Sequence, residues 1–300
     1  MFSTIEELLK KAEKEPALKL AVAAAGDEVV LESVKKADEK NIIEPILIGD
    51  KQKIETGLNE INYNFKGSII ETDSDRESAH KAISLIANGE ADYPMKGLLS
   101  TKIILQALLD KQYGLRKDRL LSLVTMMHFK REDRIVFLTD GGMNIDPDLE
   151  DKAEIVTNAV EMARSLGIDE PKVAPLAAVE KVNPAMPATI DAANLSKMAD
   201  RGQIKNAQID GPLAFDNAVS LEAAHHKGIE SRVAGRADIL LVPDIEAGNV
   251  LYKALVFYAQ LPSASLIFGA KVPVVLTSRA DSATTKLNSI ALGKLVTLGM

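Results

Sequence analysis

The stretch Lys271-Val-Pro-Val-Val-Leu-Thr-Ser-Arg-Ala-Asp-Ser282 decides the fold, because it predicts a buried strand that ends in polar residues just before a helix. In an open parallel sheet, ligands bind beyond the carboxyl ends of the strands. Ser278 and Arg279 are therefore the first candidates for a ligand site. The alternative is a capped helix start, in which Asp281 or Ser282 accepts the free N–H groups of the first turn. That alternative explains Arg279 poorly, since a cation beside a helix N-terminus opposes the helix dipole unless an anion lies between them.

Three more segments repeat this arrangement of a strand, a polar turn and a helix. The predicted strands and the turns that follow them are 134–139 with 140–144, 208–210 with 211–212, and 238–242 with 243–249. Taken singly, each is an ordinary connection, because Gly supplies unusual dihedrals and Asp or Asn caps the next helix. Four such strand ends at one rim of a sheet would instead form a ligand site.

The composition indicates a large α/β protein. The chain has 300 residues, of which 46% are hydrophobic, and this length suffices for two α/β domains. The net charge of -7 argues against a nucleic-acid surface. The absence of cysteine excludes disulfides, thiolate metal sites and a cysteine nucleophile. No apolar run reaches the roughly 18 residues of a membrane span, and the N-terminus has no signal core, so we expect a cytoplasmic protein with no membrane partner.

Strands and helices alternate along the chain, which is typical of parallel crossover units rather than hairpins. The segment 114–134 is less regular and contains a charged patch at 130–134. We place a domain boundary there and expect residues 1–133 plus 282–300 to form one α/β domain and residues 134–281 the other. We further expect a loop at 182–190 before a helix that begins near Asp191.

The standard nucleotide and metal patterns are absent. There is no Gly-x-x-x-x-Gly-Lys-Ser/Thr motif, and no Gly-x-Gly-x-x-Gly follows a predicted strand. His225 and His226 are adjacent on a predicted helix and point about 100° apart, so they cannot share a metal. We therefore expect no metal site and no bound cofactor.

Lys96 closes another predicted strand, with Gly97 beside it and Ser100 or Thr101 opening the next helix. A lysine next to a helix N-terminus with hydroxyl groups makes an anion site. The alternative is a solvent-exposed lysine at a strand end. Phe257 and Tyr258 lie on a helix expected from about Leu251 to Ala259, and the favoured interpretation is that they are core aromatics rather than ligand contacts.

Six motifs follow one another along the chain. They are Met95-Lys-Gly97 with Thr101, Asp140-Gly-Gly-Met-Asn144, Asp210-Gly-Pro212 with Asp216, Val233-Ala-Gly235 with Ala237-Asp238, Pro243-Asp244 with Gly248-Asn249 and Tyr252-Lys253, and Ser278-Arg-Ala-Asp-Ser282. In this order and over nearly the whole chain, they resemble the phosphate acetyl/butyryltransferase family. The last motif, followed by Lys286-Leu287, is most similar to the butyryltransferase branch.

The resemblance implies a fold and a reaction. It implies two α/β domains with parallel-rich sheets in the isocitrate-dehydrogenase-like arrangement, with the active site in the cleft between the domains. The implied activity moves a short acyl group between coenzyme A and phosphate without a metal. Coenzyme A is then a substrate, the partners are acyl-CoA, phosphate and acyl phosphate, and the protein is a homo-oligomer.

The resemblance also assigns roles to residues. Ser278 and Arg279 become the pair that holds the phosphate and stabilises the charge of the tetrahedral centre. The substrate-binding candidates are Lys96, Gly97, Thr101, Gly141, Gly142, Asn144, Asp210, Gly211, Pro212, Phe257 and Ser282.

Two positions depart from the acetyltransferase pattern. Thr285 stands where an Asp is the proposed thiol base, and Phe257 stands where that branch has an Arg. The second change favours a longer acyl chain, since each buried methylene contributes about 0.8 kcal/mol. Asp281, the nearest carboxylate in sequence, is our candidate base, and its competing role is the N-cap of the following helix.

Three alternatives remain beside a butyryl-preferring enzyme. They are a phosphate acetyltransferase, a binding protein that has lost catalysis through Thr285, and an NAD-dependent dehydrogenase of the same architecture. The sequence does not give the acyl length, the oligomer symmetry or the physiological direction.

Overall fold

A computed structural model describes residues 2–278 and 280–300, so Arg279 lies outside the described residues. The chain folds into two compact units. The first unit comprises Ile5–Arg119 and Ser263–Met300, and the second comprises Leu120–Pro262 with the residues before Ile5. Both units combine helices with mostly parallel strands, as the alternation in the sequence predicts.

The strands of the first unit follow the order β3-β2-β1-β4-β11-β10. Their bounds are β1 Leu18–Ala23, β2 Ile43–Gly49, β3 Ser68–Glu71, β4 Tyr93–Lys96, β10 Ser263–Phe268 and β11 Val274–Val275. β1, β2, β3, β4 and β11 run parallel, and β10 pairs antiparallel with β11. The carboxyl ends of five strands therefore lie at one edge of this sheet.

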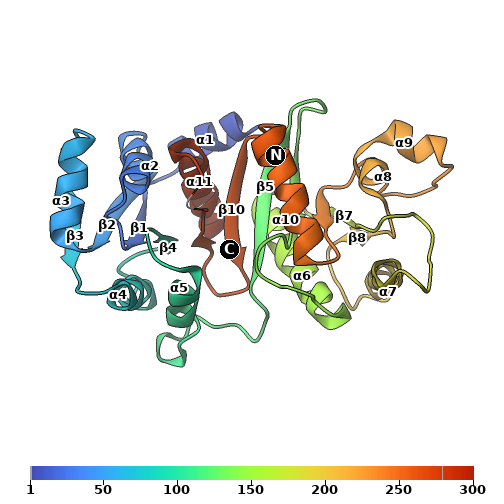
Figure 1. The fold of residues 1–300 in the computed structure, drawn as a ribbon, viewed down its shortest axis with the longest axis horizontal. Coiled ribbons are helices and arrows are strands. Elements are labelled where there is room, and N and C mark those ends of the chain that lie inside the picture. Colours follow the sequence, from blue (N-terminus) through green and yellow to red (C-terminus); the bar gives the residue numbers. More distant parts are fainter. Residues whose placement is uncertain (1, 279) are drawn as a thin grey trace. The chain divides into compact units, whose positions relative to one another are not determined.

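Helices cover both faces of this sheet. Their bounds are α1 Ile5–Lys14, α2 Glu28–Glu39, α3 Lys51–Glu60, α4 Asp75–Ala87, α5 Thr101–Leu108, the 3₁₀ turn η1 Lys111–Tyr113 and α11 Ala283–Gly299. Figure 1 shows α2, α3 and α11 on one side of the strands and α4 and α5 on the other. α11 is buried on nearly every side from Lys286 to Val296, and its buried residues include the polar side chains of Lys286, Asn288, Ser289 and Lys294.

The strands of the second unit follow the order β5-β6-β9-β7-β8. Their bounds are β5 Ser122–Phe129, β6 Arg134–Thr139, β7 Lys172–Pro175, β8 Gln208–Ile209 and β9 Ile239–Leu241. The helices are α6 Leu149–Ser165, α7 Pro187–Asp200, α8 Phe215–Val219, α9 Leu221–His226, α10 Ile245–Lys253 and the π-helical turn η2 Ala254–Tyr258. β6, β9, β7 and β8 run parallel, so their carboxyl ends share an edge too.

Several expectations about the elements are wrong. The two units contain hairpins as well as crossovers, because β5 pairs antiparallel with β6 and β10 with β11. α7 begins at Pro187 rather than near Asp191, since a proline fits the first turn of a helix. α10 begins at Ile245 rather than near Leu251, because Asp244 accepts the Ala247 N–H and caps it.

The compact units also differ in their bounds from the predicted domains, 1–133 plus 282–300 and 134–281. The chain changes unit at 119/120 and at 262/263. The physical reason is strand pairing: the β5–β6 hairpin keeps 122–139 together, and β11 pairs with β4 and β10, which keeps 263–281 with the first unit.

Candidate active site

The carboxyl edge of the first unit brings together residues from two of the motifs. Lys96, at the end of β4, and Ser278, after β11, line the same small cavity of about 30 Å3. Its other lining residues are Asp27, Val30, Gly97, Leu98, Thr277 and Lys286. The expectation that polar strand ends meet at one rim is therefore confirmed for β4 and β11.

The turn between β11 and α11 is closed by Asp281. Its Oδ2 accepts the Ser278 N–H at 2.7 Å, and its own N–H donates to the Ser278 carbonyl at 3.2 Å. Burial raises the pKa of Asp281, while the Ser278 N–H and the charge of Lys286 act in the opposite direction. Ser278 itself is exposed. The turn thus presents the serine to solvent over a buried carboxyl group.

The cap of α11 is Ser282, whose Oγ accepts the Thr285 N–H at 3.2 Å. The alternative that Asp281 is the N-cap is therefore wrong, because its carboxylate holds the turn before the helix instead. The Thr285 hydroxyl lies 3.2 Å from the Ser282 Oγ. The predicted roles of Ser282 and Arg279 toward substrate stay predictions.

Lys96 is only 6% exposed, so the alternative of a solvent-exposed strand-end lysine is wrong. Its ammonium donates to the Gly97 carbonyl at 3.2 Å and to the Leu99 carbonyl at 3.0 Å. These bonds hold the turn that leads into α5, whose first residue is Thr101 and whose N-cap is Ser100. Whether Lys96 also binds an anion stays a prediction.

Gly97 has a structural reason to be glycine. A Cβ atom at this position would lie 2.2 Å from the Ala24 carbonyl oxygen, which is backbone and cannot turn away. The Gly97 N–H donates to the Ala23 carbonyl at 2.8 Å. The close approach of two strand ends at the rim therefore depends on Gly97.

In the second unit, Asp140 organises the loop after β6. Its Oδ1 accepts the N–H groups of Gly142 and Met143 at 2.9 and 3.0 Å, and its Oδ2 accepts from Asn144 Nδ2 at 2.6 Å. Burial raises the pKa of Asp140 against these three bonds. Asn144 also donates to the Leu121 carbonyl. Gly142 and Asn144, which we predicted to bind substrate, therefore have a structural role in this loop. Asp140, which accepts their hydrogen bonds, was not among the predicted site residues.

Gly141 packs against the first turn of α10. A Cβ on Gly141 would lie 3.0 Å from the Gly248 carbonyl oxygen, and a Cβ on Gly248 would lie 2.7 Å from the Gly141 Cα. Asn249 Nδ2 donates to the Gly141 carbonyl at 3.3 Å. The motifs 140–144 and 243–249 are therefore in direct contact, and the expectation that polar strand ends meet is confirmed here as well.

The motif Asp210-Gly211-Pro212 follows β8, and its Gly211–Pro212 peptide is cis. The Asp210 N–H donates to the Val173 carbonyl at 3.2 Å. A Cβ on Gly211 would lie 3.0 Å from the Pro175 carbonyl oxygen. The motif fixes the end of β8 beside β7, and its predicted contact with substrate stays a prediction.

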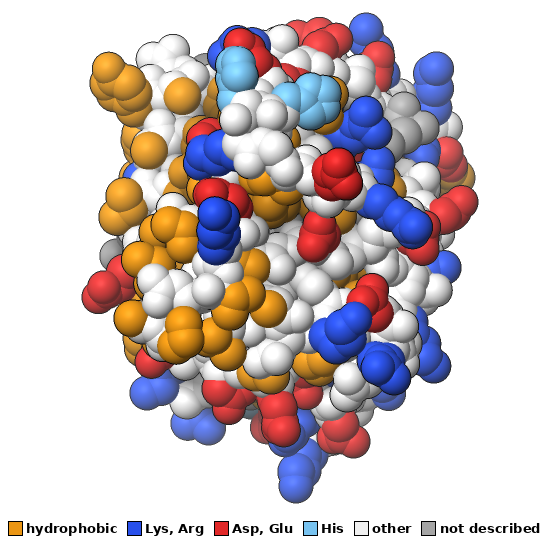
Figure 2. Space-filling view, turned by 90° about the vertical axis from the view of Figure 1, so that its right-hand side faces the viewer, with side chains coloured by type: hydrophobic (Ala, Val, Ile, Leu, Met, Phe, Trp, Pro, Cys, Tyr) orange, Lys and Arg blue, Asp and Glu red, His pale blue; other side chains and the backbone are white. Residues whose placement is uncertain are grey.

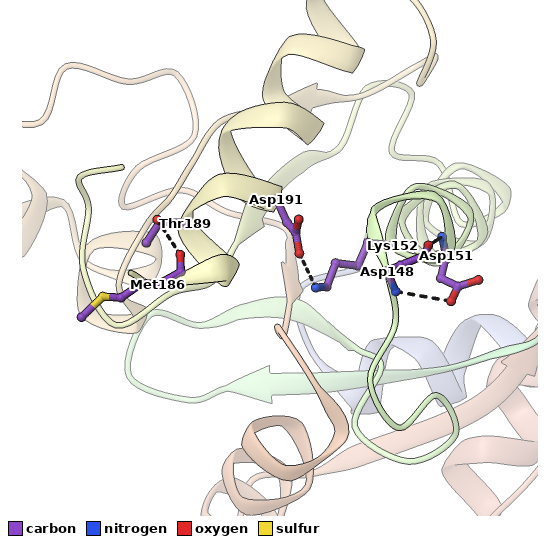
Figure 3. Close-up of polar contacts among 6 residues, drawn as sticks. All are labelled: Asp148, Asp151, Lys152, Met186, Thr189 and Asp191. Carbon is purple, nitrogen blue, oxygen red and sulfur yellow. Dashed lines mark hydrogen bonds and ion pairs between the residues drawn. The ribbon is translucent and has the colours of Figure 1, made fainter. Parts of the chain in front are cut away.

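An apolar cavity of about 600 Å3 lies at the same edge of the second unit. Its lining residues are Asp146, Lys152, Leu176, Ala177, Ala178, Met186, Pro187, Ala188, Phe215, Val242, Pro243, Asp244, Ala247 and Leu251. Lys152 is buried and pairs with Asp191 at 2.6 Å, and Thr189 donates to the Met186 carbonyl where α7 begins (Figure 3). Figure 2 shows one face of the molecule, on which hydrophobic and charged side chains are interspersed.

Phe257 and Tyr258 lie in the π-helical turn η2 and are 54% and 91% exposed. The alternative of core aromatics is therefore wrong for both. An exposed aromatic ring retains the capacity for a ligand contact, so this prediction for Phe257 stands untested.

Two features are absent from residues 2–278 and 280–300. No group of three or more His, Cys, Asp or Glu side chains among them is placed to hold a metal ion. No helix in this part of the chain is long and apolar enough to cross a bilayer.

Comparison with known proteins defines the class. The family described as Phosphate acetyl/butaryl transferase matches residues 69–293, and this chain belongs to that family. Phosphate butyryltransferase of Clostridium beijerinckii is 48% identical over 99% of this chain and 98% of its own length. Phosphate acetyltransferase of Thermotoga maritima is 48% identical over 91% of this chain and 93% of its own length.

A solved structure agrees with the fold. The crystal structure of a branched-chain phosphotransacylase from Enterococcus faecalis V583 superposes with a TM-score of 0.82 at 33% identity. The match covers 93% of this chain and 99% of that one.

Proposed function

We propose that this chain transfers a short acyl group between coenzyme A and phosphate, so that acyl-CoA and phosphate give acyl phosphate and coenzyme A. Membership of the transferase family over residues 69–293 carries the proposal. The turn between β11 and α11 supports it locally, because an exposed serine there lies over a buried carboxyl group. We further propose that the two domains have the isocitrate-dehydrogenase-like arrangement, that the active site lies in the cleft between them, and that the protein is a homo-oligomer. These three proposals rest on the family resemblance.

The chemistry is a single displacement at a carbonyl carbon. In the direction of acyl-CoA synthesis, the thiol sulfur of coenzyme A bonds to the carbonyl carbon of the acyl phosphate, and the carbon–oxygen bond to phosphate breaks. The thiol must lose its proton, since the thiolate is the nucleophile. The Ser278 hydroxyl can donate to the oxyanion of the tetrahedral centre, and the Arg279 guanidinium can bind the departing phosphate through two N–H groups.

Asp281 is the proposed proton acceptor. A carboxylate is an effective general base for a thiol when its pKa is raised toward that of the thiol. Burial raises the pKa of Asp281, and its Oδ2 is already held 2.7 Å from the Ser278 nitrogen. The carboxyl group is therefore fixed beside the serine that we place at the reacting carbonyl.

The preferred acyl group is proposed to be butyryl. Sequence identity alone does not decide between butyryl and acetyl as the preferred acyl group, because a phosphate butyryltransferase and a phosphate acetyltransferase are both 48% identical to this chain. Phe257 favours the longer chain, since it adds apolar surface where the acetyltransferase pattern has an Arg. Two extra methylenes contribute at most about 1.6 kcal/mol when fully buried, which is about 15-fold in rate. Phe257 is 54% exposed, so we expect roughly three- to tenfold.

A panel of acyl-CoA substrates tests the proposal. The purified chain is mixed with phosphate and acetyl-, propionyl-, butyryl- or hexanoyl-CoA, and free thiol is measured over time. We expect the highest kcat/KM with butyryl-CoA and the same rate in the presence of a chelator. Equal or better kcat/KM with acetyl-CoA would contradict the butyryl preference, and loss of activity in chelator would contradict a metal-free reaction.

A further inference from the structure

Lys286 lies in the first turn of α11 and is only 3% exposed. Its ammonium donates to the Ser278 carbonyl at 2.8 Å and to the Thr277 hydroxyl at 3.1 Å. Both acceptors belong to the segment that leaves β11 and carries the Ser278-Arg279 pair. A buried lysine near a helix N-terminus is unfavourable, because the charge loses its hydration and opposes the helix dipole. The bonds to Thr277 and Ser278 and the charges of Asp281 and Asp27 oppose that cost.

Three charged residues from three elements lie around Lys286. Asp27 caps α2, Lys96 closes β4, and Asp281 closes the turn on the amino side of α11. Asp27 and Asp281 favour the charged ammonium, whereas burial lowers the pKa of Lys286. Two lysines and a carboxylate therefore line one cavity beneath the exposed serine.

The burial of Lys286 indicates what it can do. Its side chain is only 3% exposed, and its ammonium already donates to the Thr277 hydroxyl and the Ser278 carbonyl. Lys286 is therefore placed to act through the segment that it holds.

We propose that Lys286 is a positioning residue for acyl transfer. Its ammonium fixes Thr277 and Ser278 where the chain leaves β11, so that the Ser278 hydroxyl meets the acyl phosphate in one orientation. The inference rests on the proposed function, since it requires this turn to be the reacting site. Misplacing a reacting group by about an ångström costs on the order of a hundredfold in rate.

The helix itself provides a matched control. Lys294 lies two turns further along α11, is 0% exposed, and donates to the Ala12 and Glu15 carbonyls at 2.8 and 2.9 Å. It is a buried lysine with two hydrogen bonds to main-chain oxygens, remote in sequence from the Ser278 turn. A loss that comes only from removing a buried ammonium will therefore occur in both variants.

The test compares Lys286→Met and Lys294→Met with the native enzyme in the thiol-release assay and in thermal melts. We expect both variants to melt below the native protein, and only Lys286→Met to lose kcat, by roughly thirty- to a hundredfold with KM for acyl-CoA within about twofold. Equal kcat in the two lysine variants, or a loss in Lys286→Met that is confined to KM, overturns the inference.

The remaining outcomes are also decisive. If Lys286→Met does not fold, Lys286→Gln replaces it. The amide nitrogen of glutamine is one bond nearer to the main chain than the ammonium, so it cannot keep both bonds to Thr277 and Ser278 at their native lengths. We expect about a tenfold loss of kcat, and native kcat overturns the inference. An inactive native protein refutes the proposed function itself, and this inference with it. Native activity with an unaffected Lys286 variant refutes only the inference.

Discussion

Replacement of Asp281 by asparagine separates its structural role in the turn from its proposed role as the general base. The Asp281 Oδ2 accepts the Ser278 N–H at 2.7 Å, and an asparagine Oδ1 can accept the same bond. The turn should therefore survive. As a base, however, the amide cannot take the thiol proton, and we expect kcat to fall by roughly 10² to 10⁴.

The pKa of Asp281 determines the direction in which Asp281→Asn changes the stability of the folded protein. Burial raises the pKa of folded Asp281 above its usual value of 3.8. The stability that this shift contributes is fully present below pH 3.8 and is lost as the pH rises through the folded pKa. Asparagine carries no such penalty at neutral pH, so Asp281→Asn should melt at or above the native temperature. Asp281→Ala, which removes the acceptor, should cost about 1–3 kcal/mol.

The assay is thiol release with butyryl-CoA and phosphate, paired with thermal melts of both variants at pH 5 and pH 8. A native kcat in Asp281→Asn refutes the base assignment. A lost kcat accompanied by a melting temperature as low as that of Asp281→Ala also refutes it, because the change would then be structural.

Two further substitutions test the site and the acyl preference. Gly97→Ala brings a Cβ to 2.2 Å from the Ala24 carbonyl oxygen and should cost about 1–3 kcal/mol in a thermal melt, whereas in Gly57→Ala the new Cβ meets only the end of a flexible leucine side chain and should be much better tolerated. Equal melting temperatures for the two variants would contradict the close approach at the rim. Phe257→Arg should lower the ratio of kcat/KM for butyryl-CoA over acetyl-CoA toward one, while Tyr258→Arg, at a residue that is 91% exposed, should leave it unchanged. An unchanged ratio in Phe257→Arg would remove Phe257 from the acyl site.

Most of the fold was predictable where local signals agree. β1 and α2 follow from an apolar run that ends before Asp27, which caps the helix through the Val30 N–H. β10, Ser263–Phe268, was not predicted, because its apolar run is only the three residues Leu266–Phe268. The β5–β6 hairpin was missed because its turn, residues 130–133, is charged and contains no Gly or Pro.

The site was predictable only in part. The motif order placed Ser278 and Lys96 at strand ends, and the structure places both on one cavity. The sequence could not tell which of two neighbouring residues caps α11, because Asp281 and Ser282 are both good caps. Nor could it show that Lys286 is buried beneath the serine, since a lysine in the first turn of a helix is usually solvated. Tertiary packing, rather than any local pattern, determines both.

The most direct measurement follows butyryl-CoA and inorganic phosphate incubated with the purified chain, by thiol titration and phosphorus NMR of the same sample. The proposed function predicts that free coenzyme A and butyryl phosphate form in equal amounts, and that no thiol appears when phosphate is omitted. Thiol release that does not depend on phosphate, or an absence of acyl phosphate while thiol accumulates, would contradict acyl transfer to phosphate.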